Sequence, residues 1–132
     1  MTFTMKPIGY VYTEAADIPR HWRISDVEGR IVIDPEYVAG LADIDPGQRI
    51  VVLFCFHKSP PFVPELLKQT PPHRDHPMGV FSICSPRRPN PIGLSVLEVL
   101  NINGGEIHVR GLDMLDQTPV LDIKPHIEEI PD

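Results

Sequence analysis

Short apolar runs, separated by prolines, glycines and polar clusters, set the pattern of this chain. The longest run covers residues 50–56, which are seven consecutive apolar side chains rich in β-branched and aromatic types. Such a run predicts a strand that is buried on both faces. Residues 8–12, 27–33 and 120–123 have the composition of further strands. Since Asp122 and Lys124 lie two positions apart, their side chains should share one face.

A hairpin is predicted in the C-terminal half of the chain. Two strand-like segments, 94–102 and 107–112, are separated by a glycine-containing turn at residues 103–106. The apolar positions of the first segment do not alternate strictly, which allows a β-bulge. Residues 79–83 predict one more strand, upstream of this hairpin.

Few segments favour a helix. A short helix is expected over residues 35–43, with Asp34 before it to cap the free amides. A single helical turn is expected around residues 64–68. Residues 14–25 have no clear period and predict an irregular loop, in which Trp22 is expected to cover the core.

These elements define an all-β protein. Six to eight short strands, almost no helix and 16 prolines are typical of a β-barrel or a β-sandwich. With 132 residues, of which 42% are hydrophobic, the chain has the size of a single domain with a real core and not the composition of a disordered segment.

The loop at residues 85–93 is the strongest candidate for a binding element. Pro86, Pro89 and Pro91 fix the backbone, so this loop loses little entropy when a ligand arrives. It carries two arginines, one of them Arg88, and the amide of Asn90. Guanidinium and amide groups can hold a carboxylate, a phosphate or a base edge. We interpret the loop as a ligand-binding loop and not as a structural corner.

Charge is distributed unevenly along the chain. The whole chain has a net charge of −6, but residues 57–88 contribute +3 and the rest −9. One basic region in an acidic protein favours a local anionic ligand over an extended coating by nucleic acid. The alternative is that Lys68 and Arg74 are ordinary solvated charges. His57 and Lys58 belong to this region and follow directly after the longest apolar run, where binding residues often lie.

The cysteines and histidines give only a weak metal signal. Cys55 and Cys84 lie in apolar runs and are expected to be buried, reduced thiols; Cys84 could instead be a nucleophile beside the arginines. His73 and His76 suggest zinc, but the chain has no Cys-x-x-Cys pair, so we expect no metal. Rossmann and P-loop nucleotide-binding sequences are absent. Since the chain has neither a signal-peptide pattern nor an apolar run of about 18 residues, we expect a cytoplasmic protein that does not enter a membrane.

Several motifs together carry a family resemblance. They are Pro-Ile-Gly at residues 7–9, Val-Glu-Gly-Arg at 27–30, Phe-His at 56–57, Gly-Val-Phe at 79–81, Ser-Pro-Arg-Arg-Pro-Asn-Pro-Ile-Gly at 85–93, and Asp-Met-Leu-Asp-Gln-Thr-Pro-Val-Leu-Asp-Ile-Lys-Pro at 113–125. In this order the chain resembles the TsaA-like family, whose characterised branch is tRNA methyltransferase O. The match covers nearly the whole chain. Two positions depart from the family pattern: Cys84 stands where an arginine is usual, and Gln117 where a glycine is usual.

The resemblance implies a fold, an activity and a set of site residues. It implies a small single-domain β-barrel that forms a homodimer and binds S-adenosylmethionine. The implied reaction is methylation of N6 of threonylcarbamoyladenosine, next to the tRNA anticodon. The residues carried over to the methyl-donor site are Pro19, Arg20, His21, His57, Lys58, Cys84, Leu94, Gly111, Leu112, Asp113 and Met114. Arg88, Asn90, Asp116 and Lys124 match polar motif positions and should line the same cleft.

Methyl transfer from a sulfonium chiefly needs alignment and a dry, shaped site, which a rigid loop and apolar strand ends can supply. Because a carbamoylated amine is a poor nucleophile, a general base would help, and Asp116 and His57 are the candidates. Arg88 and Asn90 complete the predicted catalytic group. Two alternatives stay open: a protein that binds S-adenosylmethionine but acts on a small molecule or only senses the cofactor, and a zinc-dependent hydrolase.

Overall fold

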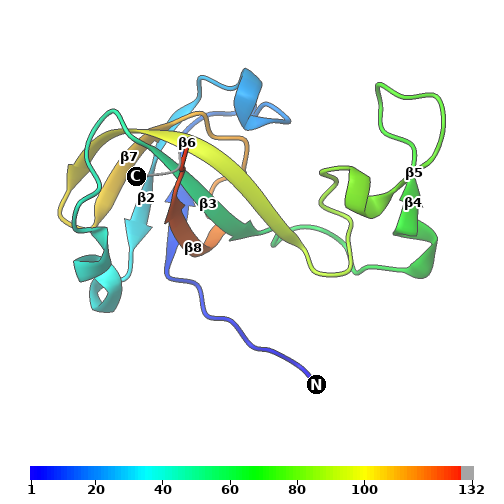
Figure 1. Cartoon of the computed structure of the whole chain (residues 1–132), viewed down its shortest axis with the longest axis horizontal. Helices are drawn as coiled ribbons and strands as arrows, with labels where there is room; N and C mark the ends of the chain where they lie inside the picture. Colours follow the sequence, from blue (N-terminus) through cyan, green and yellow to red (C-terminus); the bar gives the residue numbers. More distant parts are fainter. Residues whose placement is uncertain (129–132) are drawn as a thin grey trace.

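The computed structural model describes residues 1–128 and consists of a closed antiparallel β-barrel with a long arm (Figure 1). Six strands close the barrel in the order β1-β2-β7-β6-β3-β8. Their bounds are Gly9–Tyr12 (β1), Glu28–Ile33 (β2), Arg49–Cys55 (β3), Ile92–Asn103 (β6), Glu106–Arg110 (β7) and Pro119–Pro125 (β8). The prediction of a small β-barrel is therefore confirmed, and its sandwich alternative is wrong.

Alternation along the strands places one face of each in the barrel interior. On β3, Ile50, Val52 and Phe54 are buried in the core, whereas the residues between them are only half-buried. The predicted burial of this strand on both faces is thus wrong for the outer face. The strands close on themselves into a barrel instead of lying between two layers of helices, so each strand has one inner and one outer face.

The predicted hairpin is present as β6 and β7, joined at Gly104, whose φ of 61° suits the turn. The pairing shifts between Val99 and Asn101, so the predicted bulge is confirmed. On β8, Lys124 Nζ lies 3.0 Å from Asp122 Oδ2, which confirms that the two side chains share a face.

All helices among residues 1–128 are short 3-10 helices. They are Trp22–Ile24 (η1), Pro35–Leu41 (η2), Pro64–Leu67 (η3) and Val80–Ser82 (η4). The predicted cap is wrong in detail, because the side chain of Asp34 makes no capping hydrogen bond; its backbone oxygen instead accepts from the Tyr37 amide at 2.9 Å. Trp22 packs against the core, as predicted. No helix in this part of the chain is both long enough and apolar enough to cross a membrane.

Residues 57–91 form the arm, which leaves the barrel after β3 and returns to it at β6 (Figure 1). The arm contains η3, η4 and a two-stranded ribbon of β4 (Lys68–Gln69) and β5 (Met78–Gly79). The predicted strand at 79–83 is wrong beyond Gly79. Val80 turns inward and is buried, and the Ile83 amide closes a helical turn on its carbonyl, so the alternation of a strand is lost.

The antiparallel order gathers the three long connections at one end of the barrel. Residues 13–27 (β1 to β2), the arm (β3 to β6) and residues 111–118 (β7 to β8) all leave from this end. The other end carries η2 and the tight β6–β7 turn. Since loops positioned by a rigid scaffold are the usual carriers of function, this topology determines where a site can be built.

Candidate functional site at one end of the barrel

Asp113 joins three elements at this end of the barrel. Its carboxylate accepts a hydrogen bond from Ser95 Oγ on β6 at 2.5 Å and another from the backbone amide of Trp22 in η1. His21 lies close enough to act on it electrostatically. Burial raises the pKa of the Asp113 carboxyl, while the Ser95 hydroxyl, the Trp22 amide and His21 each act in the opposite direction without cancelling that rise.

Backbone hydrogen bonds fix the chain around Asp113. The amides of Gly111 and Leu112 both donate to the Val27 carbonyl, at 2.9 and 3.1 Å. The Ser25 hydroxyl donates to the Leu112 carbonyl at 2.5 Å. Gly111 has a φ of 105°, which glycine adopts without strain. The predicted site residues at 19–21 and 111–114 therefore lie on neighbouring segments of the chain.

Several predicted donor-site residues can offer only part of their atoms. The side chains of Leu112 and Met114 belong to the hydrophobic core, so only their backbone atoms remain for a ligand. Leu94 points to the outer wall of the barrel and is 54% exposed. Pro19 is half-buried and Arg20 is exposed, so both border the solvent.

His21 has a defined role in the local backbone. Its Nδ1 accepts a hydrogen bond from the Arg23 amide at 3.1 Å and caps η1. When the ring is neutral its proton must therefore lie on Nε2, which leaves an N–H donor for a ligand.

The loop at 85–93 is braced as its prolines predict. Arg88 Nη1 donates to the carbonyl oxygens of Ile83 and Ser85, both at 3.1 Å, and so ties the loop to the segment before it. Gln69 Nε2 on β4 donates to the Arg87 carbonyl at 2.7 Å, and Ser59 Oγ donates to the Pro86 carbonyl at 3.1 Å. The remaining N–H groups of Arg88 are left for a ligand.

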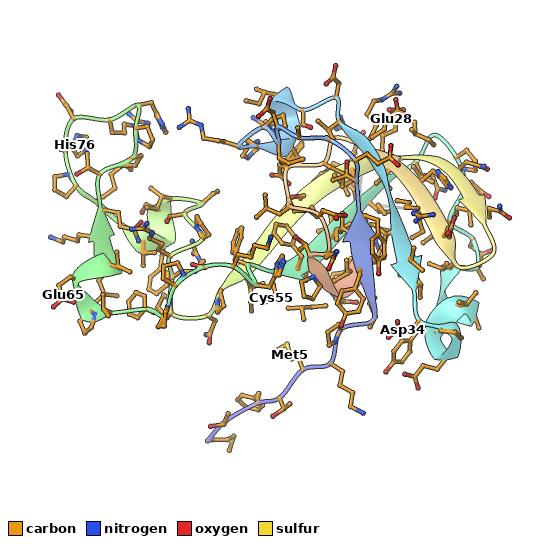
Figure 2. The ribbon with its side chains drawn as sticks, turned by 180° about the vertical axis from the view of Figure 1, so that it is seen from behind. Met5, Glu28, Asp34, Cys55, Glu65 and His76 are labelled. Atoms are coloured by element: carbon orange, nitrogen blue, oxygen red, sulfur yellow. The ribbon has the colours of Figure 1, made fainter. Side chains whose placement is uncertain are left out.

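His57, Lys58, Cys84 and Asn90 are all exposed and lie on the arm. The Phe56 amide donates to the Pro91 carbonyl at 2.8 Å, which brings the two ends of the arm together. The thiols are free, but their predicted burial is wrong: Cys84 is exposed on the arm, and Cys55 is half-buried because it points to the outer face of β3 (Figure 2).

Asp116 lies at a third position. Its Oδ1 accepts from the Thr13 amide at 3.0 Å and so ties the β7–β8 connection to the end of β1. The next residue, Gln117, has a φ of 66°. Glycine adopts this left-handed conformation more easily than other residues do, which explains why a glycine is usual at this position.

The predicted residues thus form two groups. His21 and residues 111–114 gather around Asp113, whereas the Arg88 loop, His57, Lys58, Cys84 and Asn90 belong to the arm. Among residues 1–128, no hydrogen bond or ion pair joins one group to the other or to Asp116. The same residues hold no group of three or more potential metal-ligating side chains. His76 lies on the distal part of the arm (Figure 2).

Ser95 and the Trp22 amide were not predicted. Ser95 is fully buried at an inward position of β6 between Gly93 and Leu97. A lone hydroxyl within an apolar alternation is the signal that could have identified Ser95, because a buried hydroxyl needs a partner. The contribution of Trp22 comes from its backbone amide, which every residue except proline has, so no sequence pattern could have identified it.

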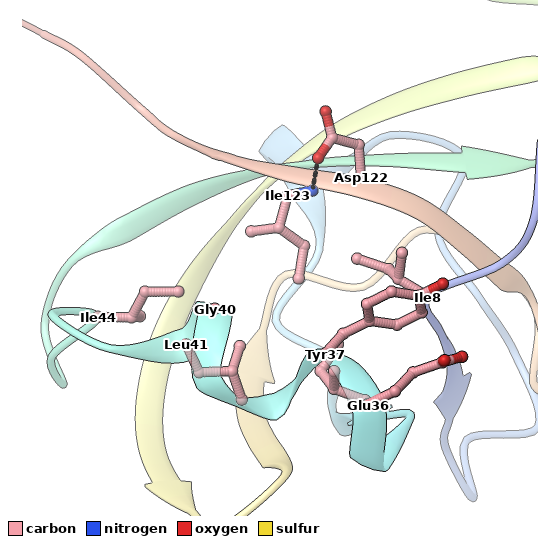
Figure 3. Close-up of a pocket in the computed structure, with 9 residues that line it drawn as sticks. Ile8, Glu36, Tyr37, Gly40, Leu41, Ile44, Asp122 and Ile123 are labelled. Atoms are coloured by element: carbon pink, nitrogen blue, oxygen red, sulfur yellow. Dashed lines mark hydrogen bonds between the residues drawn. The ribbon is translucent and has the colours of Figure 1, made fainter.

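A separate cavity of about 390 Å³ lies at the other end of the barrel, between η2 and the sheet (Figure 3). Ile8, Leu41, Ile44 and Ile123 are among the apolar residues that line it. The carboxylate of Asp122 on its rim is already engaged by the Ile123 amide at 2.9 Å and by Lys124. None of the predicted donor-site residues lines this cavity.

The barrel and its loops place this chain among the small β-barrel proteins with a partly buried carboxylate at one end. The chain belongs to the tRNA-methyltransferase O N-terminal domain family, whose family model matches residues 8–132. This result confirms the resemblance inferred from the motifs.

Individual relatives agree with the family. An S-adenosyl-L-methionine-binding protein of Archaeoglobus fulgidus is 41% identical over 129 residues, covering 96% of this chain and 91% of that protein. A human tRNA (adenine(37)-N6)-methyltransferase is 34% identical over 134 residues, covering 94% of this chain and 30% of the human protein. The crystal structure of TrmO from Pseudomonas aeruginosa matches with a TM-score of 0.77 and 31% identity, covering 96% of this chain and 57% of that one. The chain thus spans just over half of the solved TrmO chain.

Proposed function

We propose that this protein is an S-adenosylmethionine-dependent methyltransferase whose substrate is tRNA, with N6 of threonylcarbamoyladenosine beside the anticodon as the acceptor. The observation that carries the proposal is the cluster of His21 and residues 111–114 around Asp113, in a chain of this family. The name of the Archaeoglobus fulgidus relative supports the cofactor, and the name of the human relative supports the tRNA substrate.

The donor side of the reaction is assigned to the Asp113 cluster. When bound, S-adenosylmethionine supplies an electrophilic methyl group on a positively charged sulfur. The carboxylate of Asp113 lowers the energy of a nearby cation, and the Nε2–H of His21 can donate to a carboxylate or ribose oxygen. The backbone of residues 111–114 is held rigidly enough to orient a ligand without a large loss of entropy.

The acceptor side is assigned to the arm and Asp116. Arg88 and Asn90 would orient the acceptor, and His57 or Asp116 would take the proton that leaves the acceptor nitrogen as its new bond to carbon forms. S-adenosylmethionine held beside Asp113 would supply the methyl group and leave as a neutral thioether, while the proton of the acceptor nitrogen would stay on His57 or Asp116.

We also infer that two copies of the chain assemble. The outer faces of β3 and β6 carry six apolar residues opposite one another in the sheet register: Val51, Leu53, Cys55, Ile92, Leu94 and Val96, of which Val96 is buried and the three on β3 are half-buried. Ile92 and Leu94 are 39% and 54% exposed. An exposed apolar patch of this kind is typical of a protein interface, and a second copy would supply the second half of a symmetric one.

The test is a tritiated-methyl assay on total tRNA, followed by mass spectrometry of the nucleosides. The proposal expects label in methylated threonylcarbamoyladenosine. Because some archaeal relatives are named only as binding S-adenosylmethionine, a cofactor sensor is the second candidate. Calorimetric binding of the cofactor without label in any RNA would favour the sensor, and the absence of cofactor binding would contradict both candidates.

A further inference from the structure

The cations on the barrel wall are neutralised by neighbouring carboxylates. Arg30 lies 3.2 Å from Glu106, Arg110 2.7 Å from Glu98, and Lys124 3.0 Å from Asp122, while Arg49 lies 3.9 Å from Glu128. These pairs are exposed and contribute little to stability, but they leave little net positive potential on the wall. The barrel wall therefore offers no attraction to a polyanion.

The cations of the arm are different. Lys58, Lys68, Arg74 and Arg87 are all exposed, and within residues 1–128 none of them lies within ion-pair distance of a carboxylate. The arm contains only two acidic residues, Glu65 and Asp75, of which Asp75 contacts His76. Eight Lys and Arg side chains have no ion-pair partner within residues 1–128: five lie on this projecting arm, and Lys6, Arg20 and Arg23 lie elsewhere.

The arm is also stiff and carries an exposed aromatic side chain. Nine of the chain's 16 prolines lie within it, and the Gln69 amide ties its ribbon to the Arg87 carbonyl. Phe81 is 79% exposed. Exposed cations and an exposed aromatic ring on one element are the groups with which proteins follow a phosphate backbone and stack an unpaired base.

We propose that the arm, residues 57–91, is the RNA-binding element of this protein, with Lys68 and Arg74 contacting phosphates. This inference rests on the proposed function and adds the surface that holds the RNA. A second copy is the less favoured occupant of the arm, because the apolar surface assigned above to a second copy lies on the outer faces of β3 and β6. The arm would hold RNA while the barrel end holds the methyl donor.

The experiment compares two double variants of equal charge. Lys68→Gln with Arg74→Gln removes two arm cations, and Arg30→Gln with Arg49→Gln removes two paired wall cations, so net charge falls by the same amount in both. Affinity for a fluorescein-labelled RNA hairpin is measured by anisotropy over a series of salt concentrations. Cofactor affinity is measured by calorimetry, and the oligomeric state by sedimentation.

The arm variant is expected to bind RNA about tenfold more weakly, with a salt dependence that is shallower by about 1.5 in log–log slope for two lost phosphate contacts. The wall variant should behave like the unmodified protein, and methyl transfer by the arm variant should show a higher KM for RNA with kcat retained.

Equal losses in both variants, or no RNA binding by the unmodified protein, would overturn the inference. A change of oligomeric state in the arm variant alone would also overturn it and assign the arm to a second copy. Loss of methyl transfer with RNA binding intact would instead count against the proposed function.

Discussion

At the scale of single residues, Asp113 combines a structural and an electrostatic role. Its carboxylate connects β6 and η1, yet it is held in a buried place that disfavours its charge. The raised pKa is compatible with the proposed donor site, because a cationic ligand would favour the ionised form that burial disfavours.

The first prediction concerns the pH dependence of this carboxyl. Since burial raises its pKa in the folded state, folding favours the protonated form, and this contribution is lost as pH rises through the raised value. Asp113→Asn should therefore be at least as stable as the unmodified protein at neutral pH, and its advantage should shrink as pH falls below the raised pKa. Urea denaturation at several pH values measures this.

Ser95→Ala, the control, leaves the carboxylate without its hydroxyl donor and should cost about 1–3 kcal/mol at neutral pH. An advantage of Asp113→Asn that grows on acidification would contradict the argument.

The second prediction concerns Arg88. Because its guanidinium ties residues 83–85 to the loop, Arg88→Ala should lower methyl transfer by about 100-fold or more through misplacement of the loop, with the barrel still folded. Single-turnover assays and circular dichroism check the two parts. Arg87→Ala, one residue away and without such bonds, should lose much less. Undiminished turnover by Arg88→Ala would remove this residue from the site.

At the scale of elements, β6 shows how close packing fixes a glycine. Gly93 pairs with Phe54 across the sheet, and a Cβ placed there would overlap the Phe54 ring and lie 2.8 Å from the Phe56 ring. Gly93→Ala should cost about 1–3 kcal/mol in the free energy of unfolding, because neither ring can withdraw from the packed end of the barrel. Gly79→Ala, where a Cβ would meet nothing within 4 Å, is the control and should stay within about 0.5 kcal/mol. Equal effects in chemical denaturation would show that the rings yield.

The same elements show what the sequence could and could not predict. Alternation and turn residues located the β6–β7 hairpin and its bulge, because these depend on neighbours along the chain. The strand expected at 79–83 failed because residues 80–82 form a helical turn, in which Val80 is buried without belonging to a sheet. At the site, motifs located Asp113, but its bonds to Ser95 and the Trp22 amide arise only when β6 and η1 meet, over sequence separations that no local pattern records.

At the scale of the whole molecule, the apolar outer face of β3 and β6 predicts self-association. Ile92→Lys places a charge on this face and should weaken a dimer about tenfold or more, since desolvating an unpaired charge in an interface is costly. Tyr10→Lys is the matched control: Tyr10 is 36% exposed on the outer face of β1, close to the 39% of Ile92. Sedimentation equilibrium measures both. A monomeric unmodified protein, or equal weakening by the two variants, would contradict the prediction.

The proline-rich arm has a consequence for how the molecule regains activity after unfolding. Each of its nine X-Pro bonds is trans in the native chain, but about 10–30% of each turns cis in an unfolded chain, so few unfolded molecules have the whole arm in its native isomer. The barrel strands, with few prolines, should form first and restore the fluorescence of Trp22. Binding of RNA should return tens of seconds later, on the timescale of isomerisation, and a prolyl isomerase should shorten that lag without changing the fast phase.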